Sequence, residues 1–340
     1  MAPSDANVIT AYKAAASTTS NPSTSEVLAT IAADTTLNDT EAALSNTLTH
    51  LKIADGVTLT VEADAFDNSG NEWSALTTLT GVGNNNNVII DNSNAIGATT
   101  VDLYGISSLT GIDSLIIRDT GGADTINLSP TITTSGITTV ALTAGDNAGD
   151  KIYFGVDDSD FTKASGNVIN YTNVTGFGVG YDRIGLYYYG DSDSPVSAVN
   201  ATKRTGATSG VATMTTDRTF IEDDSNSNFK NMSEFNEVSE VKAQIANAVL
   251  TYSVGSSEAN SRLMYAHYTY SEAESTNYAV INAADLTGSS TTSDLTTATD
   301  FEVVGIAQLA GVAEGSLGTF GGGIGGFNLT ATKAAGLGGR

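Results

Sequence analysis

The chain contains no cysteine and only two histidines among its 340 residues. Disulfides and thiolate metal sites are therefore excluded, and zinc binding or histidine-based catalysis has few side chains to use. Oxygen atoms of carboxylates, amides and backbone carbonyls are the metal ligands that remain. The sequence also lacks an apolar run long enough to span a bilayer, so we expect no membrane insertion.

Positive charge is scarce as well. The 14 lysines and arginines face 38 aspartates and glutamates, which gives a formal net charge of -24. Such a chain repels phosphate backbones and anionic membrane surfaces, and nucleic acid is therefore not an expected partner. Divalent cations that bind on folding would neutralise part of this charge.

The N-terminal sequence "MAPSDANVITAYK" has no basic segment followed by an apolar one, which is the profile of a secretory signal peptide. Two locations fit this observation. The protein stays in the cytoplasm, or it is exported in one step from a signal at its C-terminal end.

The pattern predicts a mainly β protein that begins with short helices. Residues 1–54 are expected to be helical, because Asp39 suits an N-cap and Leu44, Leu48 and Leu51 recur at helical spacing. From residue 55 to about 220, short β-rich runs alternate with turn residues. These runs are "VTLTVEA", "NNVIIDN", "TTVDLYG", "DSLIIRD", "DTINLS", "TTVALTA" and "DKIYFGV".

No segment between these runs is long enough for a crossover helix, so the strand array is either a β-solenoid or an antiparallel sandwich. Loose self-similarity favours the solenoid. Both "LTTLTGVGNNNNVIIDN" and "SLTGIDSLIIRDTGGADTINL" place Leu-Thr-Gly ahead of an Ile-Ile pair and an aspartate. Neighbouring coils of a solenoid stack, so loosely similar repeats suffice.

The C-terminal part is expected to differ. Residues 221–320 predict an α+β module, in which an amphipathic helix over 231–250 packs with three strands. The strands correspond to "NSRLMYAHYTY", "NYAVINAAD" and "DFEVVGIAQLAGV". Residues 321–340 form a Gly-rich tail, a candidate secretion signal.

Three turns combine glycine, aspartate and a following apolar residue in a constant order. They are "GGADTINL", "AGDNAGDKIYF" and "GFGVGYDRIGL". In calcium-binding solenoid repeats the glycines form a tight turn, the aspartate faces the ion and the apolar residue enters the core. The candidate metal ligands in these turns are Asp119, Gly121, Gly122, Asp124, Asp146, Asp150 and Asp182.

Other acidic clusters are candidates too. In "EDDSNSN", Asp224, Asn226 and Asn228 alternate as at the start of many calcium loops, although the central glycine is missing. Similar candidates are Asp64, Asp67 and Asn71 in "EADAFDNSGNEW", and Asp191 and Asp193 in "YGDSDSP". For every one of these clusters the alternative is an ordinary β-turn or solvated loop, since aspartate, asparagine and glycine are the usual turn residues.

No catalytic motif stands out. The sequence has no HExxH, no Walker loop and no GxSxG, and neither His50 nor His267 belongs to a recognisable triad. We therefore expect no enzyme. Tyr187, Tyr188 and Tyr189 alternate along an expected strand, so at least one of them should face outward, toward solvent or a bound molecule.

These residues together resemble RTX-like proteins exported by type I secretion, including crystalline surface-layer proteins of Gram-negative bacteria. "NVITAYKAAAS" is similar to their N-terminal opening, "AGDNAGDKIYF" and "VTGFGVGYDRIGL" to the edges of RTX repeats, and "TDFEVVGIAQLAGVAEGSLGTFGG" to their last strands. The chain departs from the family in lacking tandem full nonapeptides.

The resemblance implies a secreted, cell-surface protein that folds with calcium as its cofactor outside the cell. It also implies that the chain's main partner is itself, in a surface layer or a matrix filament, with cell-surface polysaccharide or lipopolysaccharide as the anchor. The alternative hypothesis is a secreted calcium-binding adhesin or glycan-binding module, in which the Tyr-rich strand contacts the ligand.

Overall fold

The structure is a computed structural model, and within the residues that it describes the protein is mainly β, with a β-solenoid of about four turns. The described residues are 28–37, 48–66, 73, 75–92, 97–119, 121–156, 170–179, 181–188, 200–204, 210–214, 218–223, 250–254, 262–271, 276–285, 293–294, 301–313 and 327–329.

Three sheets form the sides of the solenoid. The first sheet has the order β1 (Leu28–Ile31), β3 (His50–Ile53), β5 (Thr78–Gly81) and β8 (Ser108–Thr110). The third sheet has the order β23 (Phe327–Leu329), β14 (Arg183–Tyr188), β12 (Lys151–Val156), β10 (Thr125–Leu128) and β7 (Thr100–Leu103). All of these pairings are parallel.

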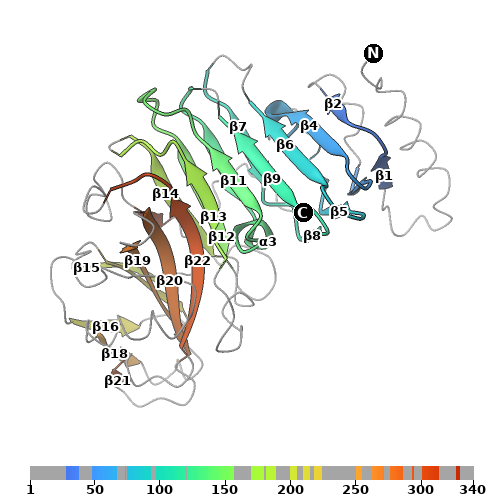
Figure 1. Cartoon of the computed structure of the whole chain (residues 1–340). Helices are drawn as coiled ribbons and strands as arrows, with labels where there is room; N and C mark the ends of the chain where they lie inside the picture. Colours follow the sequence, from blue (N-terminus) through green and yellow to red (C-terminus); the bar gives the residue numbers. More distant parts are fainter. Residues whose placement is uncertain are drawn as a thin grey trace.

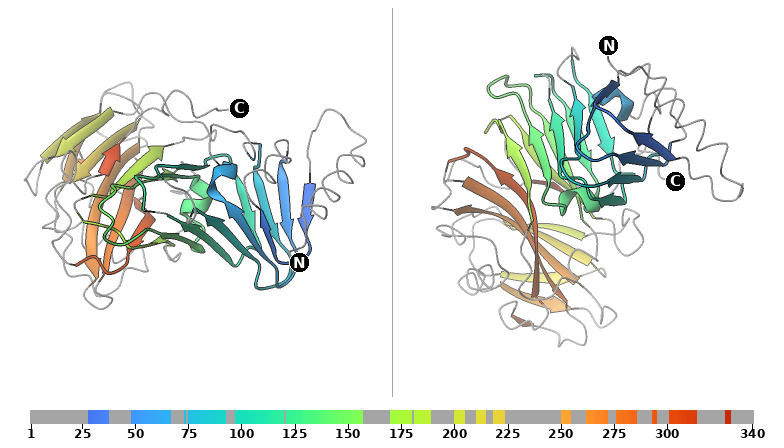
Figure 2. Two further views of the ribbon diagram at one scale, coloured as in Figure 1. Left: turned by 90° about the horizontal axis from the view of Figure 1, so that it is seen from above. Right: turned by 45° about the vertical axis from the view of Figure 1, so that its right-hand side comes forward.

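The second sheet has 11 strands. Within a coil such as β5, β6 and β7, the chain passes from the first sheet to the second and then to the third. Its solenoid part is β2 (Thr35–Leu37), β4 (Thr58–Glu62), β6 (Asn87–Asp91), β9 (Ser114–Arg118), β11 (Thr138–Ala141) and β13 (Thr172–Thr175). These strands lie side by side from blue to green in Figure 1, and the two views of Figure 2 show the coils stacked along one axis.

The second sheet continues beyond the solenoid. β22 (Phe301–Leu309) pairs parallel with β13, and β20 (Thr276–Asp285) and β19 (Arg262–Ser271) follow it antiparallel. β17 (Arg218–Asp223) and β15 (Asn200–Arg204) complete the sheet. A separate small sheet contains β16 (Gly210–Met214), β18 (Leu250–Val254) and β21 (Ser293–Asp294). The three strands expected after residue 260 are thus confirmed, and one sheet runs across the expected boundary at residue 220.

The core of the solenoid consists of ladders of inward-facing aliphatic side chains. Leu59, Val88 and Leu115 are opposite one another in β4, β6 and β9, and each is at most 1% exposed. Ile126, Ile152 and Ile184 form the equivalent ladder of the third sheet. Full burial of one such side chain contributes about 1.5–3 kcal/mol. Because each coil contacts only the coils next to it, this burial depends on the stacking of neighbouring coils.

Parallel pairing decides between the two β architectures that the sequence allowed, because a sandwich of hairpins would pair antiparallel. The self-similar segments occupy equivalent positions in adjacent coils, with Leu79 opposite Leu109 and Ile90 opposite Ile117. The glycine after each Leu-Thr pair is needed for close approach, since a Cβ on Gly81 would overlap the carbonyl of Gly111.

The expected N-terminal helices are wrong for residues 28–37 and 48–54, which contain β1, β2 and β3. Leu44, Leu48 and Leu51 recur at helical spacing, but residues 50–53 also alternate with the period of two that is typical of a strand. The strand pattern is the one that the structure follows, with Leu51 and Ile53 buried and His50 and Lys52 half-buried. The remainder of 1–54 and the helix expected over 231–250 lie outside the described residues, apart from residue 250 in β18.

Helical turns in the described residues are short. The 3-10 helix η2 (Ala63–Phe66) lies beside β7, and α3 (Pro130–Thr133) follows β10. Ser129 caps α3 by accepting a hydrogen bond from the Ile132 N–H, and Pro130 suits the first helical turn, where its missing N–H costs nothing.

Candidate metal centre

The turns that lead from the second sheet to the third sheet contain most of the sequence-predicted ligands. We call them the acidic corner, defined by the described residues 92, 97–99, 119, 121–124, 142–150, 176–179, 181 and 182. Each turn is flanked by strands that are paired in register, so the turns stack on one another at the strand spacing of about 4.8 Å. Residues far apart in the sequence therefore become neighbours.

One column of the acidic corner consists of Thr99, Asp124, Asp150 and Asp182, the residues directly before β7, β10, β12 and β14. Each aspartate accepts a hydrogen bond from the backbone N–H of the residue before it in the column. The N···O distances are 2.6 Å from Thr99 to Asp124, 2.9 Å from Asp124 to Asp150 and 2.9 Å from Asp150 to Asp182.

These side-chain hydrogen bonds explain why aspartate suits this column. At a corner the regular ladder of the sheet is interrupted, and a buried backbone N–H needs another acceptor. The residue after each aspartate completes the link between coils, because Lys151 N donates to Asp124 O at 2.9 Å and Arg183 N donates to Asp150 O at 2.8 Å. Aspartate therefore fixes adjacent coils to each other in register.

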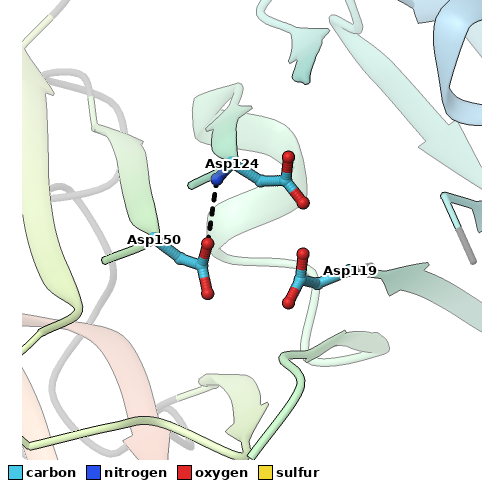
Figure 3. Close-up of side chains that lie close together, drawn as sticks. All are labelled: Asp119, Asp124 and Asp150. Carbon is cyan, nitrogen blue, oxygen red and sulfur yellow. Dashed lines mark hydrogen bonds between the residues drawn. The ribbon is translucent and has the colours of Figure 1, made fainter. Parts of the chain in front are cut away.

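Asp119 joins this column from the other end of its turn, directly after β9. It is 7% exposed, and its two carboxylate oxygens accept hydrogen bonds from Thr143 N at 2.9 Å and Gly121 N at 3.3 Å. One oxygen each of Asp119, Asp124 and Asp150 lie within 4.8 Å of one another, and Figure 3 shows the three carboxylates around a common space. Two successive coils thus supply the cluster.

One oxygen in this cluster has no hydrogen-bond donor. Asp150 is 1% exposed, its Oδ1 accepts from Asp124 N, and its Oδ2 has no hydrogen-bond partner. A buried carboxylate oxygen without a donor costs several kcal/mol unless a proton or a cation compensates it. The site therefore provides both negative charge and an unused lone pair.

The pKa values of these carboxyl groups respond to this environment. Burial raises the pKa of Asp150 to about 7, and the nearby charges of Asp119, Asp182 and Asp146 add to the effect. Burial also raises the pKa of Asp124 to about 6, against the opposing effect of its hydrogen bonds from Thr99. Near neutral pH a proton or a cation would therefore stabilise the cluster.

The donor set fits a hard cation. The three clustered ligands are carboxylates, and divalent ions such as Ca²⁺ and Mg²⁺ prefer oxygen donors. The described histidine closest in sequence, His50, is in the first sheet, where its Nε2 lies 3.1 Å from Thr80 Oγ1. A soft or imidazole-bound metal is therefore not favoured by these residues.

The predicted aspartate ligands differ in whether they belong to the carboxylate cluster. Asp119, Asp124 and Asp150 come together, whereas both oxygens of Asp182 accept backbone hydrogen bonds, from Asp150 N and from Gly178 N at 2.6 Å. Asp146 lies at the edge of the corner, with Oδ1 accepting from Ala148 N at 3.1 Å and Oδ2 buried without a hydrogen-bond partner.

The two predicted glycines are explained by backbone geometry. Gly121 has φ of +84°, and a Cβ on Gly122 would overlap the carbonyl of Gly97 in the coil below. Their role as ligands through backbone carbonyls stays a prediction. Several other sequence candidates lie outside the described residues, namely Asp67, Asn71, Asp191, Asp193, Asp224, Asn226 and Asn228.

Sequence reasoning missed Asn92 and Thr99, which contact Asp124 from the preceding coil. Asn92 Nδ2 lies 3.2 Å from Asp124 Oδ2, and Thr99 Oγ1 lies 2.8 Å from Asp124 Oδ1. A signal for Thr99 was present, because "ATTVDL" aligns with "ADTINL" when threonine is accepted in place of aspartate.

The chain matches no protein-family model, no curated protein and no solved structure. Among the described residues, no helix has the length and apolar character needed to cross a membrane.

Proposed function

We propose that this chain is an extracellular structural protein whose solenoid folds around calcium and which assembles with copies of itself into a surface layer or matrix filament. The observation that carries the proposal is the buried cluster of Asp119, Asp124 and Asp150, in which Asp150 Oδ2 has no hydrogen-bond donor. The resemblance to RTX-like exported proteins supports it from the sequence.

Calcium suits this cluster better than magnesium. Ca²⁺ accepts six to eight oxygen ligands in irregular geometry, including backbone carbonyls, whereas Mg²⁺ requires a near-ideal octahedron. The acidic corner offers three carboxylates from two coils and the carbonyls of Gly-rich turns. Millimolar calcium outside cells would largely occupy a site with a Kd of about 10⁻⁴ M and add its binding free energy to folding.

Bound calcium would also permit self-assembly. A net charge of -24 makes copies of the chain repel one another at low ionic strength, and bound divalent cations reduce this repulsion. A solenoid presents long, regular sides on which neighbouring molecules pack. Calcium would thus act twice, within the solenoid and between molecules.

The test compares the wild-type chain with Asp124→Asn and with Asp55→Asn as a matched control. Asp55 also accepts a backbone hydrogen bond across coils, from Asn84 N at 2.8 Å, but it is solvent-exposed. With calcium at 100 times its Kd we expect about 2.7 kcal/mol of added stability for wild type and Asp55→Asn, and almost none for Asp124→Asn. Circular dichroism melts and negative-stain electron microscopy measure stability and assembly together.

Identical melts and particle sizes with calcium and with excess chelator would overturn the calcium part of the proposal. A calcium-stabilised chain that stays a monodisperse monomer and binds cell-surface polysaccharide would overturn the assembly part and favour the adhesin hypothesis.

A further inference from the structure

The coil that precedes the carboxylate cluster carries neutral residues at the same two positions. Asp91 is opposite Arg118 in the second sheet, which puts Asn92 opposite Asp119. Thr100 is opposite Thr125 in the third sheet, which puts Thr99 opposite Asp124. The pair Asn92 and Thr99 is therefore the uncharged equivalent of the pair Asp119 and Asp124.

This neutral pair holds the Asp124 carboxylate through both of its oxygens. Oδ1 accepts from the Thr99 backbone N–H at 2.6 Å and from the Thr99 hydroxyl at 2.8 Å, and Oδ2 accepts from the Asn92 amide at 3.2 Å. The Asn92 amide also contacts Thr99 Oγ1, and Asn92 is 3% exposed. Three donors from one coil fix the plane of a carboxylate in the next coil.

In the two following coils, the position equivalent to Asp119 has no carboxylate. Arg118 is opposite Ala141, so that Leu142 occupies the position equivalent to Asp119, and Leu142 is buried at 7% exposure. One coil further, Ala141 is opposite Thr175, which puts Gly176 at this position. Among these four turns, carboxylates occupy both positions only at Asp119 and Asp124.

We propose that Asn92 and Thr99 are positioning residues of the cation site, which orient Asp124 for the ion and, with Leu142 on the other side, confine the corner to one cation. This inference rests on the proposed calcium site. An uncharged pair donates hydrogen bonds to Asp124 without adding negative charge, whereas a second stacked carboxylate pair would need a second ion. Residues that orient metal ligands in this way typically alter affinity about 10- to 100-fold when removed.

The experiment measures calcium binding to the full chain by titration calorimetry, for wild type, Asp124→Asn, Asn92→Ala and Thr99→Val. Two controls match burial and chemistry away from the site. Asn86→Ala removes a buried amide that donates to Gly111 O at 3.2 Å, and Thr138→Val removes a buried hydroxyl near Ile132 O. Melts with chelator record the loss of stability that each variant causes without the ion.

We expect Asp124→Asn to remove one calcium per chain, and Asn92→Ala and Thr99→Val to weaken that same ion about 10- to 100-fold. In the presence of chelator, the two controls should lower the melting temperature about as much as Asn92→Ala and Thr99→Val do. Their calcium affinity should stay within about twofold of wild type. A structural role alone would not separate these two readouts.

Different failures have different meanings. If Asp124→Asn loses no calcium, both the proposed site and this inference are wrong. If it loses one ion but Asn92→Ala and Thr99→Val bind calcium as wild type does, only the positioning role is wrong. A loss of two ions in Asp124→Asn would contradict confinement to one cation.

Discussion

At two corners of the solenoid, aspartate side chains accept hydrogen bonds from backbone N–H groups of a neighbouring coil. One is the acidic corner. The other, which we call the open corner, lies between the first and second sheets at residues 32–34, 54–57, 82–86 and 111–113. There, Thr58 N donates to Asp34 at 2.9 Å, Asn84 N to Asp55 at 2.8 Å and Asn86 N to Asp113 at 2.8 Å.

The corners differ in burial and in what lies opposite each aspartate. Asp34, Asp55 and Asp113 are exposed, and the residues that donate to them are threonine or asparagine. In the acidic corner, aspartates follow one another in adjacent coils and are buried. One hydrogen bond therefore links coils at either corner, whereas stacked carboxylates in a buried position, as the proposed cation site requires, occur at the acidic corner.

The largest difference between the corners is expected when the aspartate side chain is removed. Asp150→Ala leaves the buried Asp124 N–H without its acceptor, which costs about 1–3 kcal/mol, and it also removes a ligand of the proposed cation site. With calcium at 100 times Kd a further loss of about 2.7 kcal/mol is expected. Urea unfolding of the calcium-saturated proteins measures the sum.

Asp113→Ala is the matched change at the open corner. It removes one acceptor from Asn86 N at an exposed carboxylate, for which we expect about 0.5–1.5 kcal/mol and no change in calcium dependence. Equal losses for Asp150→Ala and Asp113→Ala would break the distinction between the corners.

The next largest effect concerns how folding stability depends on pH when no cation is bound. The folded pKa of Asp150 is about 7 and that of Asp124 is about 6, both above the ordinary value of 3.8. The folded state therefore binds more protons than the unfolded state, and stability decreases as pH rises from about 4 through 7. In chelator, the melting temperature should be higher at pH 5 than at pH 7.5.

Calcium should reduce or reverse this trend, because the ion requires deprotonated carboxylates. Asp124→Asn should weaken the pH dependence in chelator, while Asp55→Asn should retain it. A wild-type melting temperature that rises from pH 5 to pH 7.5 in chelator would contradict the burial of uncompensated carboxylates at the acidic corner.

The smallest effect is expected at a surface ion pair in the second sheet, directly before the acidic corner. Arg118 in β9 pairs with Asp91 in β6 at 3.4 Å, and Arg118 is 45% exposed. Such surface pairs contribute about 0–1 kcal/mol, so Arg118→Gln should change the free energy of unfolding by less than 1 kcal/mol. A larger loss in urea unfolding would mean that charge pairing between coils matters outside the corners.

Much of the solenoid could be predicted from the sequence. Each of the seven β-rich runs from "VTLTVEA" to "DKIYFGV" contains a strand, because alternating apolar residues and turn glycines are local signals. The coil length was not predictable. Equivalent residues are 29 positions apart from Leu59 to Val88 but 23 apart from Leu115 to Thr138, so no fixed period appears.

The sequence indicated which aspartates could form the candidate site, but not which of them lie close together. Asp119, Asp124 and Asp150 were identified from their turns, and the structure brings them together. Asp182 belongs to the same pattern, yet both of its oxygens are used by backbone donors. Asn92 carries no sequence signal of its own, because its importance comes from lying opposite Asp119 in the next coil.

The sequence by itself determined that oxygen atoms are the main potential metal ligands, that the chain would carry strong negative charge and that short strands would alternate with tight turns. Those properties depend on residue type and on near neighbours along the chain. Only the tertiary structure decided which aspartates share a site, because register between coils brings Asp119 and Asp124 to Asp150, 26 residues beyond Asp124. Burial then separates these carboxylates from the chemically identical ones at the open corner.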